Sequence, residues 1–234
     1  MSTPLEYTGK ERADRVQNMF SKIAGRYDLM NRLMTAGQDV RWRKEVIARA
    51  QLDAGDSLLD LGAGTGDLAR EALKPHPAIS ALAADSPTEL MLAGKKNGAL
   101  DWSAADALNL PFPDERFDAV VSGFLMRNVT DVMRALNEQK RVLKPGGRIV
   151  ILDTTRPRKN LLTPFINIHL NYIIPTLGQL LTGERDAYTY LPDSTQHFLR
   201  AEELAAKMQE AGFKDVDFSV KMFGTVAIHW GVKK

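Results

Sequence analysis

The sequence predicts an α/β fold in which a doubly wound, mostly parallel sheet of seven strands ends in an antiparallel hairpin. Three observations support this fold class. An apolar strand pattern at 57–61 runs into a glycine-rich turn that opens a helix near Asp67. Further short apolar runs alternate with amphipathic helical patterns, which is typical of parallel sheets. Two strand patterns close the chain, at 215–222 and 225–232, with a turn near Gly224.

The composition is that of an ordinary globular protein. At 234 residues the chain is long enough for one sizeable α/β domain with an appendage. It contains no cysteine, which excludes disulfides, thiolate metal sites and cysteine nucleophiles, and its four histidines are scattered, so we expect no metal centre. A net charge of +2 argues against nucleic acid as a partner. The first residues have no apolar signal core, which predicts a cytoplasmic location.

Residues 1–50 are expected to form a helical cap ahead of a cofactor-binding domain at 51–234. Apolar residues recur at three- and four-residue steps between 16 and 27, and a second such pattern follows Gly37. Because these extra helices precede the first strand, they are an addition to the sheet. They either cover the ligand site or cap the sheet, and periodicity favours neither alternative.

The glycine turn after the first strand indicates which ligand the chain binds. Gly62, Gly64 and Gly66 allow positive φ angles and a close approach to a ligand at the carboxyl end of the strand. The dinucleotide fingerprint G-x-G-x-x-G places a pyrophosphate on the helix N-terminus. Here Asp67 replaces the last fingerprint glycine, and its carboxylate would repel a pyrophosphate. The pattern favours a cationic ligand without phosphate, of which S-adenosylmethionine is the common one. A tight turn without a ligand is the alternative.

Acidic residues follow the next two predicted strands. The run at 79–84 predicts the second strand and ends in Asp85, and the residues at 86–89 (Ser-Pro-Thr-Glu) read as a capping box that starts a helix. Asp85 is placed to accept hydrogen bonds from both ribose hydroxyls of an adenosine. A helix-capping carboxylate is the alternative. After a very short strand near 103–105, Asp106 either accepts the adenine amino group or is a solvated loop residue.

The second half of the chain continues the alternation. The clearest buried strand, at 117–122, leads into Gly123. A helix is expected at about 132–143, where Lys-Pro-Gly-Gly stops it and turns the chain before a fifth strand at 148–153. An amphipathic helix at 200–212 then precedes the terminal hairpin.

Residues 156–195 are expected to form an insertion that covers the acceptor. Between 160 and 183 there is no Asp, Glu, Lys or Arg, but prolines, asparagines, a histidine and a glutamine interrupt the segment and argue against a transmembrane span. An amphipathic cover over an apolar pocket, in contact with a membrane surface, is one interpretation. A plain buried helix pair is the other.

Several longer motifs resemble one family. They are Phe-Ser-Lys-Ile-Ala-Gly-Arg-Tyr-Asp-Leu-Met-Asn at 20–31, Arg-Asn-Val-Thr-Asp at 127–131, Arg-Val-Leu-Lys-Pro-Gly-Gly-Arg at 141–148, Tyr-Leu-Pro-Asp-Ser at 190–194 and Val-Ala-Ile-His at 226–229. On these motifs the chain resembles, over nearly its whole length, the ubiquinone/menaquinone biosynthesis C-methyltransferases. These are class I S-adenosylmethionine-dependent methyltransferases with a Rossmann-like fold. Leu125 stands where the family usually has glycine, and Asp153, 221–224 and Trp230 also depart from its pattern.

The resemblance implies methyl transfer from S-adenosylmethionine to a ring carbon of a polyprenyl hydroquinone. By motif, Arg127 would stabilise the phenolate or help remove its proton through a water, Asn128 would orient the acceptor oxygen, and Tyr27 would close the site. The alternatives are an ion pair of Arg127 with Asp131 and a core position for Tyr27. The expected cofactor-binding residues are Asp60, Gly62, Gly64, Thr65, Gly66, Asp85, Ser86, Asp106, Ala107 and Gly123.

Two other functions are compatible with the sequence. One is a methyltransferase of the same build that acts on another small molecule or on a lipid amine. The other is a cofactor-binding scaffold without catalysis, against which Asp85, Arg127 and Asn128 argue. The expected partner is a lipophilic quinol, and the sequence leaves both peripheral membrane contact and a homodimer open.

Overall fold

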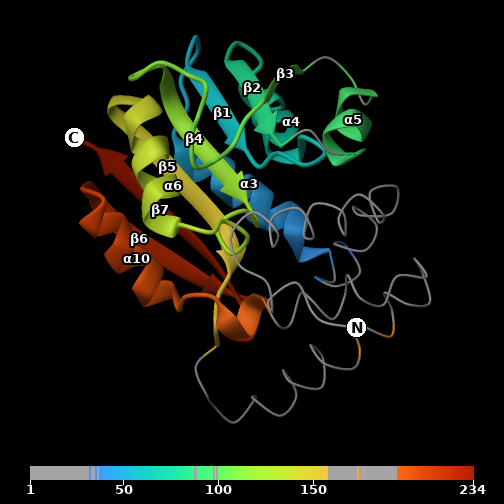
Figure 1. Cartoon of the computed structure of the whole chain (residues 1–234). Helices are drawn as coiled ribbons and strands as arrows, with labels where there is room; N and C mark the ends of the chain where they lie inside the picture. Colours follow the sequence, from blue (N-terminus) through green and yellow to red (C-terminus); the bar gives the residue numbers. More distant parts are fainter. Residues whose placement is uncertain are drawn as a thin grey trace.

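The computed structural model describes residues 37–86, 89–96, 98, 100–157 and 194–234, together with the isolated residues 32, 35, 173 and 176. The strands are β1 Ser57–Leu61, β2 Ser80–Asp85, β3 Asp101–Ala104, β4 Phe117–Gly123, β5 Leu143–Thr154, β6 Phe213–Lys221 and β7 Val226–Lys233. The helices of this part are α3 Gln38–Ala50, α4 Asp67–Leu73, α5 Glu89–Lys96, α6 Val132–Val142, α10 Ala201–Glu210 and the 3₁₀ turn η4 Met222–Gly224 (Figure 1).

The strands form one seven-stranded sheet in the order β3-β2-β1-β4-β5-β7-β6. The five strands β1 to β5 run parallel, whereas β7 pairs antiparallel with both β5 and β6. The predicted fold class is therefore confirmed. Because β1, β2, β4 and β5 are parallel, their carboxyl ends meet at one edge of the sheet, where ligands bind in such folds.

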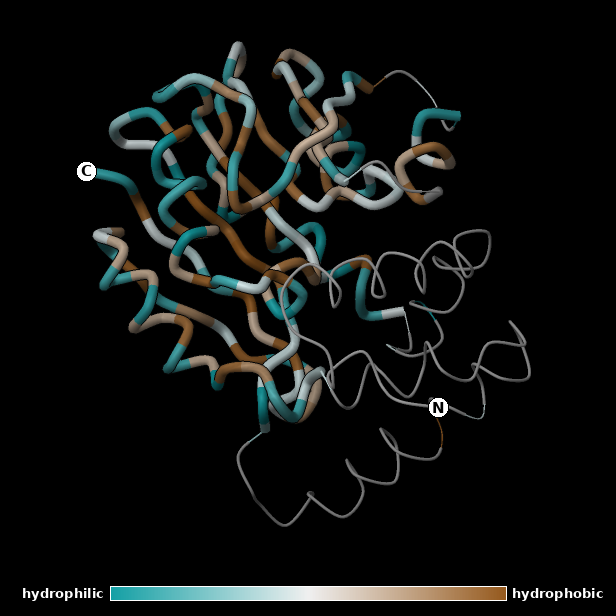
Figure 2. Tube along the Cα trace, viewed as in Figure 1, coloured by the Kyte–Doolittle hydropathy of each residue, from teal (hydrophilic) through white to brown (hydrophobic). Residues whose placement is uncertain are grey.

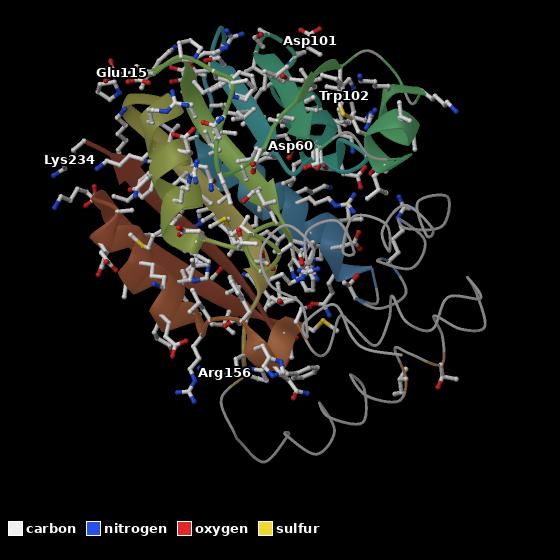
Figure 3. All side chains as sticks on the ribbon, in the orientation of Figure 1. Asp60, Asp101, Trp102, Glu115, Arg156 and Lys234 are labelled. Carbon is white, nitrogen blue, oxygen red and sulfur yellow. The ribbon has the colours of Figure 1, made fainter. Side chains whose placement is uncertain are left out.

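Helices cover both faces of the sheet, so its central strands are apolar on both sides. Successive residues of a strand point to opposite faces, and Leu59 accordingly joins a core with α6 and α10, whereas Leu58 joins a core with α3 and α4. Figure 2 shows the resulting hydrophobic run through the middle of the sheet. Charged side chains such as Asp101 lie at the periphery, but Asp60 lies in the interior (Figure 3).

Helix α3 packs on the sheet. Trp42, Val46 and Ile47 are at most 3% exposed and belong to the core on the α3–α4 face. At its outer side the Arg49 guanidinium lies 3.6 Å from the ring centroid of Trp230. The segment after Gly37 thus packs on the sheet, and whether the N-terminal helices also cover the ligand site is not decided by the described residues. Tyr27 and most of 156–195 lie outside the described residues.

Three predicted strand starts were wrong by two residues or more, and one of them is that of β6, which begins at Phe213 rather than 215 because Phe213 pairs with Lys233. The third strand spans Asp101–Ala104 rather than 103–105, because Asp101 and Trp102 already pair with β2. Strand β5 begins at Leu143 rather than after the Lys-Pro-Gly-Gly turn, because Leu143 already pairs with Phe117 of β4. A register shift follows, and regular pairing continues from Ala119 with Arg148. The local turn signal is thus absorbed into an irregular strand.

Across the described helices, none is long and apolar enough to cross a membrane.

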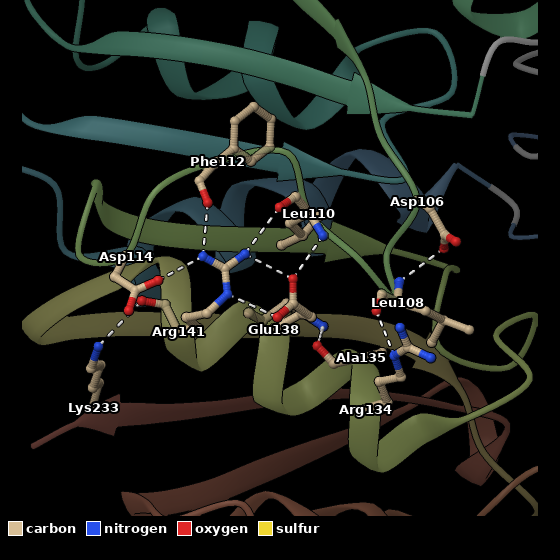
Figure 4. Close-up of polar contacts among 11 residues, drawn as sticks. Asp106, Leu108, Leu110, Phe112, Asp114, Arg134, Ala135, Glu138, Arg141 and Lys233 are labelled. Carbon is tan, nitrogen blue, oxygen red and sulfur yellow. Dashed lines mark hydrogen bonds and ion pairs between the residues drawn. The ribbon is translucent and has the colours of Figure 1, made fainter.

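Helix α6 holds the segment that follows β3 against the sheet (Figure 4). The Arg141 guanidinium donates to the carbonyls of Leu110 (3.0 Å) and Phe112 (2.8 Å), and it pairs with Glu138 (2.8 Å) on the same helix. Arg134 donates to the carbonyl of Leu108 at 2.7 Å. These bonds tie the chain just after Asp106 and Ala107 to a rigid element, which places both residues beside the end of β2.

Candidate functional site

The glycine turn between β1 and α4 has the backbone that its sequence predicts. The φ angles of Gly62, Gly64 and Gly66 are 68°, 58° and 85°. A Cβ on Gly62 would lie 2.9 Å from Cδ1 of Leu125, so a side chain there would collide with the loop after β4. A Cβ on Gly64 would meet no atom of a described residue within 4 Å. Gly62 is therefore needed for close packing, whereas no described residue fills the space beside Gly64.

Asp60, the penultimate residue of β1, is 1% exposed. Its Oδ2 accepts a hydrogen bond from the backbone N–H of Ala69 (2.9 Å) and so satisfies the first turn of α4. Its Oδ1 accepts none from any described residue. Burial raises the pKa of Asp60 to about 7, the Ala69 bond opposes this, and the nearby carboxylates of Asp67 and Asp85 add to it. A buried carboxylate with one unsatisfied oxygen is suited to a cationic or hydrogen-bonding ligand.

Asp85 braces the turn from the neighbouring strand. Its Oδ2 accepts from the backbone N–H of Gly64 at 2.6 Å, and its Oδ1 accepts from the backbone N–H of Ser86 at 2.7 Å. Burial raises the pKa of Asp85, and these two bonds oppose the rise. The backbone N–H of Gly62 also donates to the carbonyl of Ala84 (2.8 Å). Asp85 is thus at the strand tip as predicted, and its contact with Gly64 goes beyond the helix-capping alternative. Ser86 itself is exposed.

The turn carries an excess of acidic side chains on its ligand side. Asp67 at the start of α4 pairs with Arg43 of α3 at 2.5 Å, and Arg43 also pairs with the buried Asp39 at 3.1 Å. Arg70 donates to the main-chain carbonyls of Thr65 and of a residue in α5. Both arginines are therefore engaged in other contacts, and no described residue donates a hydrogen bond to Oδ1 of Asp60.

Asp106 and Ala107 follow β3 beside the end of β2. The backbone N–H of Ala105 donates to the carbonyl of Asp85 at 2.9 Å, which brings the two strand ends together. The exposed Asp106 accepts a hydrogen bond from the backbone N–H of Leu108 at 2.9 Å. This local turn is the geometry expected of the loop alternative. Ala107 is half-buried and packs on the core.

Arg127, after β4, is buried in an ion pair. Its Nη1 donates to Oδ1 of Asp153 at 2.8 Å, and the two side chains are 2% and 1% exposed. The predicted alternative, an ion pair with Asp131, was wrong in its partner. Asp131 instead caps helix α6 by accepting from the backbone N–H of Arg134 at 2.9 Å. Asp131, four residues after Arg127, thus caps α6, and Arg127 forms its ion pair with Asp153 of the adjacent strand β5.

The loop at 123–128 lies against the glycine turn at 62–66, which is called the cofactor turn below. Gly123 is half-buried, and a Cβ there would lie 3.3 Å from Leu68 of α4. The Nδ2 of Asn128 donates to the carbonyl of Phe124 at 3.1 Å. Sequence reasoning missed Asp153 as the partner of Arg127. The signal available was an acid at the end of a strand expected beside β4.

The sequence is similar to known methyltransferases over nearly its whole length. The chain matches the family model of the ubiE/COQ5 methyltransferase family over residues 8–233. It is 47% identical over 221 residues to the ubiquinone/menaquinone biosynthesis C-methyltransferase UbiE of Desulfotalea psychrophila, covering 93% of this chain and 90% of that protein. It is 43% identical to the demethylmenaquinone methyltransferase of Thermus thermophilus, covering 91% of this chain and 99% of that protein.

Among solved structures, the [4+2]-cyclase SpnF superposes with a TM-score of 0.69 at 18% identity, covering 94% of this chain and 96% of that chain. Its cyclase activity illustrates that this fold supports more than one chemistry. The sequence matches decide the assignment: the chain belongs to the ubiE/COQ5 methyltransferase family and is an S-adenosylmethionine-dependent methyltransferase.

Proposed function

We propose that this protein transfers a methyl group from S-adenosylmethionine to a ring carbon of a polyprenyl hydroquinone, of the demethylmenaquinol or demethylubiquinol type. The names of its relatives at 35–47% identity support the acceptor class. In the structure, the observation that carries the cofactor half of the proposal is the buried Asp60, whose Oδ1 no described residue satisfies.

The residues around the turn fit the cofactor. Asp60 would face its cationic methionyl end, Asp85 would accept from the ribose hydroxyls, and the space beside Gly64 would admit the ligand against the backbone. Bound there, the cofactor supplies a methyl group on a sulfonium, which is already an activated electrophile. The protein's remaining tasks are to align the acceptor carbon and to exclude water.

The acceptor must be activated by ionisation of a phenol next to the reacting carbon. A phenol has a pKa near 10, so a group that stabilises the phenolate raises the reactive fraction. A guanidinium has only hydrogen-bond donors, so an arginine is not suited to be the base. Its charge is shared with Asp153 (2.8 Å), which favours a role in holding the acceptor site over one as an isolated cation. Asn128 would orient the acceptor oxygen, Tyr27 would close the site, and the insertion at 156–195 would cover it.

We also propose peripheral contact with a membrane, from which a polyprenyl quinol would enter. Phe223 is 69% exposed and Val220 is 49% exposed. Phe223 lies in the turn that joins β6 to β7, and Val220 lies near the end of β6. This turn lies at the carboxyl edge of β5, where the N–H of Thr155 donates to the carbonyl of Thr225 (2.9 Å). Met222 and Phe223 adopt positive φ angles of 46° and 56°, a strained conformation that presents the ring outward.

The experiment is methyl transfer from labelled S-adenosylmethionine by the purified protein to three acceptors. They are a demethylated quinol under reducing conditions, the same compound as its quinone, and a phospholipid amine. Turnover on the quinol alone is expected, because the quinone has no phenol to ionise. Turnover on the amine without turnover on any quinol would replace the proposal with methylation of a lipid amine.

A further inference from the structure

The carboxylate of Asp153 binds both the main chain and the side chain of one residue. It accepts from Nη1 of Arg127 at 2.8 Å and from the backbone N–H of Arg127 at 3.2 Å, and it also accepts from the backbone N–H of Thr154 at 2.7 Å. Asp153 is 1% exposed and Arg127 is 4% exposed. A single buried carboxylate at the end of β5 therefore holds the loop that follows β4.

This loop contacts the cofactor turn on one side and β5 on the other. The backbone N–H of Phe124 donates to the carbonyl of Leu152 at 2.7 Å, and Phe124 has a positive φ of 60°, which a non-glycine residue adopts at a cost. The side chain of Leu125 lies against Gly62. Two residues later, Arg127 is held by Asp153, and its guanidinium lies 5.0 Å from the ring centroid of Phe124. The strained backbone is thus anchored at both of its ends.

We propose that Asp153 is a positioning residue for the methyl acceptor. It holds Arg127, and through Arg127 it fixes the loop at 124–128 between the cofactor turn and the acceptor. The consequence for methyl transfer rests on the proposed function, whereas the hold on the loop does not. Methyl transfer depends on alignment more than on acid–base chemistry, and a small misplacement of the aligned groups costs rate without changing cofactor affinity.

A buried ion pair is by itself weak evidence for a role beyond stability, because apolar residues of similar volume replace such pairs with little loss of stability. This gives a way to separate positioning from packing. Asp153→Asn keeps the shape and removes the charge. The double variant Arg127→Met/Asp153→Leu removes both charges and restores an apolar contact. Asp118→Asn is the matched control, since Asp118 pairs with Lys144 at 2.7 Å and also links β4 to β5, near the opposite ends of these strands.

The test combines hydrogen exchange with kinetics. In Asp153→Asn, exchange in a peptide covering 123–130 should rise by about tenfold or more, while 57–61 and 148–152 stay protected. The kcat with a quinol acceptor should fall by about tenfold to a hundredfold with the Kd for S-adenosylmethionine within about twofold of the wild type. The double variant should fold, bind the cofactor and show the same low kcat. The Asp118→Asn control should leave both the loop exchange and kcat unchanged.

Three results would overturn the inference. Unchanged hydrogen exchange of the loop in Asp153→Asn would show that Asp153 does not hold the loop, and this measurement needs no methyl acceptor. Raised exchange with wild-type kcat would show that the hold does not matter for the reaction. Wild-type turnover by the double variant would make the pair a packing feature only. A wild-type protein that methylates no quinol would refute the proposed function, and the exchange result would still decide whether Asp153 holds the loop.

Discussion

S-adenosylmethionine should bind more tightly as the pH rises from about 6 to about 7, because Asp60 must lose a proton to face a cation. With a pKa of about 7 in the free protein, about one molecule in eleven has Asp60 ionised at pH 6, and about half do at pH 7. Since apparent affinity scales with the competent fraction, the Kd should fall about fivefold over this interval. The amino group of the ligand, with a pKa near 7.7–8.0, stays mostly protonated between pH 6 and 7 and adds little to the pH dependence of Kd.

The variant Asp60→Asn isolates this effect. It should bind the cofactor more weakly at pH 7 and should show no such dependence on pH. Isothermal titration calorimetry at pH 6.0, 6.5 and 7.0, at constant ionic strength, measures both quantities. Asp101→Asn is the control, because Asp101 is exposed at the start of β3, away from the ligand edge. A flat Kd for the wild type, or an Asn variant with the wild-type slope, would refute the assignment of Asp60 to the ligand.

The stability of the cofactor-free protein gives an independent check of the same residue. A carboxyl whose pKa is raised on folding binds its proton more tightly in the folded state, so stability falls as the pH rises from about 4 to about 7. The difference between the ordinary 3.8 and about 7 corresponds to at most about 4 kcal/mol. Urea unfolding should show this slope in the wild type and a smaller slope in Asp60→Asn.

Three further predictions test the turn and the surface. Asp85→Ala should weaken S-adenosylmethionine binding by about 1.5–3 kcal/mol, measured by calorimetry, since a charged hydrogen-bond acceptor is lost; unchanged affinity would remove Asp85 from the site. Gly62→Ala should lower Tm by more than Gly55→Ala, because both glycines have positive φ but only Gly62 lies against a side chain; equal losses would mean that φ strain alone matters. Phe223→Ser should reduce sedimentation with anionic phospholipid vesicles, whereas Leu92→Ser, another exposed apolar residue, should not; equal sedimentation of both variants would argue against contact at Phe223.

Local signals predicted the first strand, its turn and the helix after it well. The β1 strand, the glycine turn and the start of α4 depend on neighbouring residues, and all three were confirmed. The start of β5 depends on pairing between Leu143 and Phe117, which are far apart in the chain, and here the local turn residues gave the wrong boundary. A turn motif specifies a bend, but pairing with the next strand decides whether the bend interrupts a strand.

The same contrast applies to the site. The positions of Asp60 and Asp85 could be predicted because each lies at the carboxyl end of a strand next to the turn, Asp60 as the penultimate residue of β1 and Asp85 as the last residue of β2. The partner of Arg127 could not, because Asp131 is near in sequence whereas Asp153 lies in the neighbouring strand. The pairing of Arg43 with Asp67 joins two helices and left no pattern in the sequence. Long-range charge pairs of this kind follow from the packing of elements and not from spacing.

Methylation of a ring carbon can be tested by locating the transferred methyl group in the product. The protein would be given S-adenosylmethionine with a ¹³C-labelled methyl group and a demethylated quinol under reducing conditions, and the product would be examined by NMR. A methyl bound to the ring carbon, with loss of the neighbouring ring proton signal, is the predicted result. A methoxy signal with the ring proton retained would instead show transfer to the phenolic oxygen and would rule out methylation of the ring carbon.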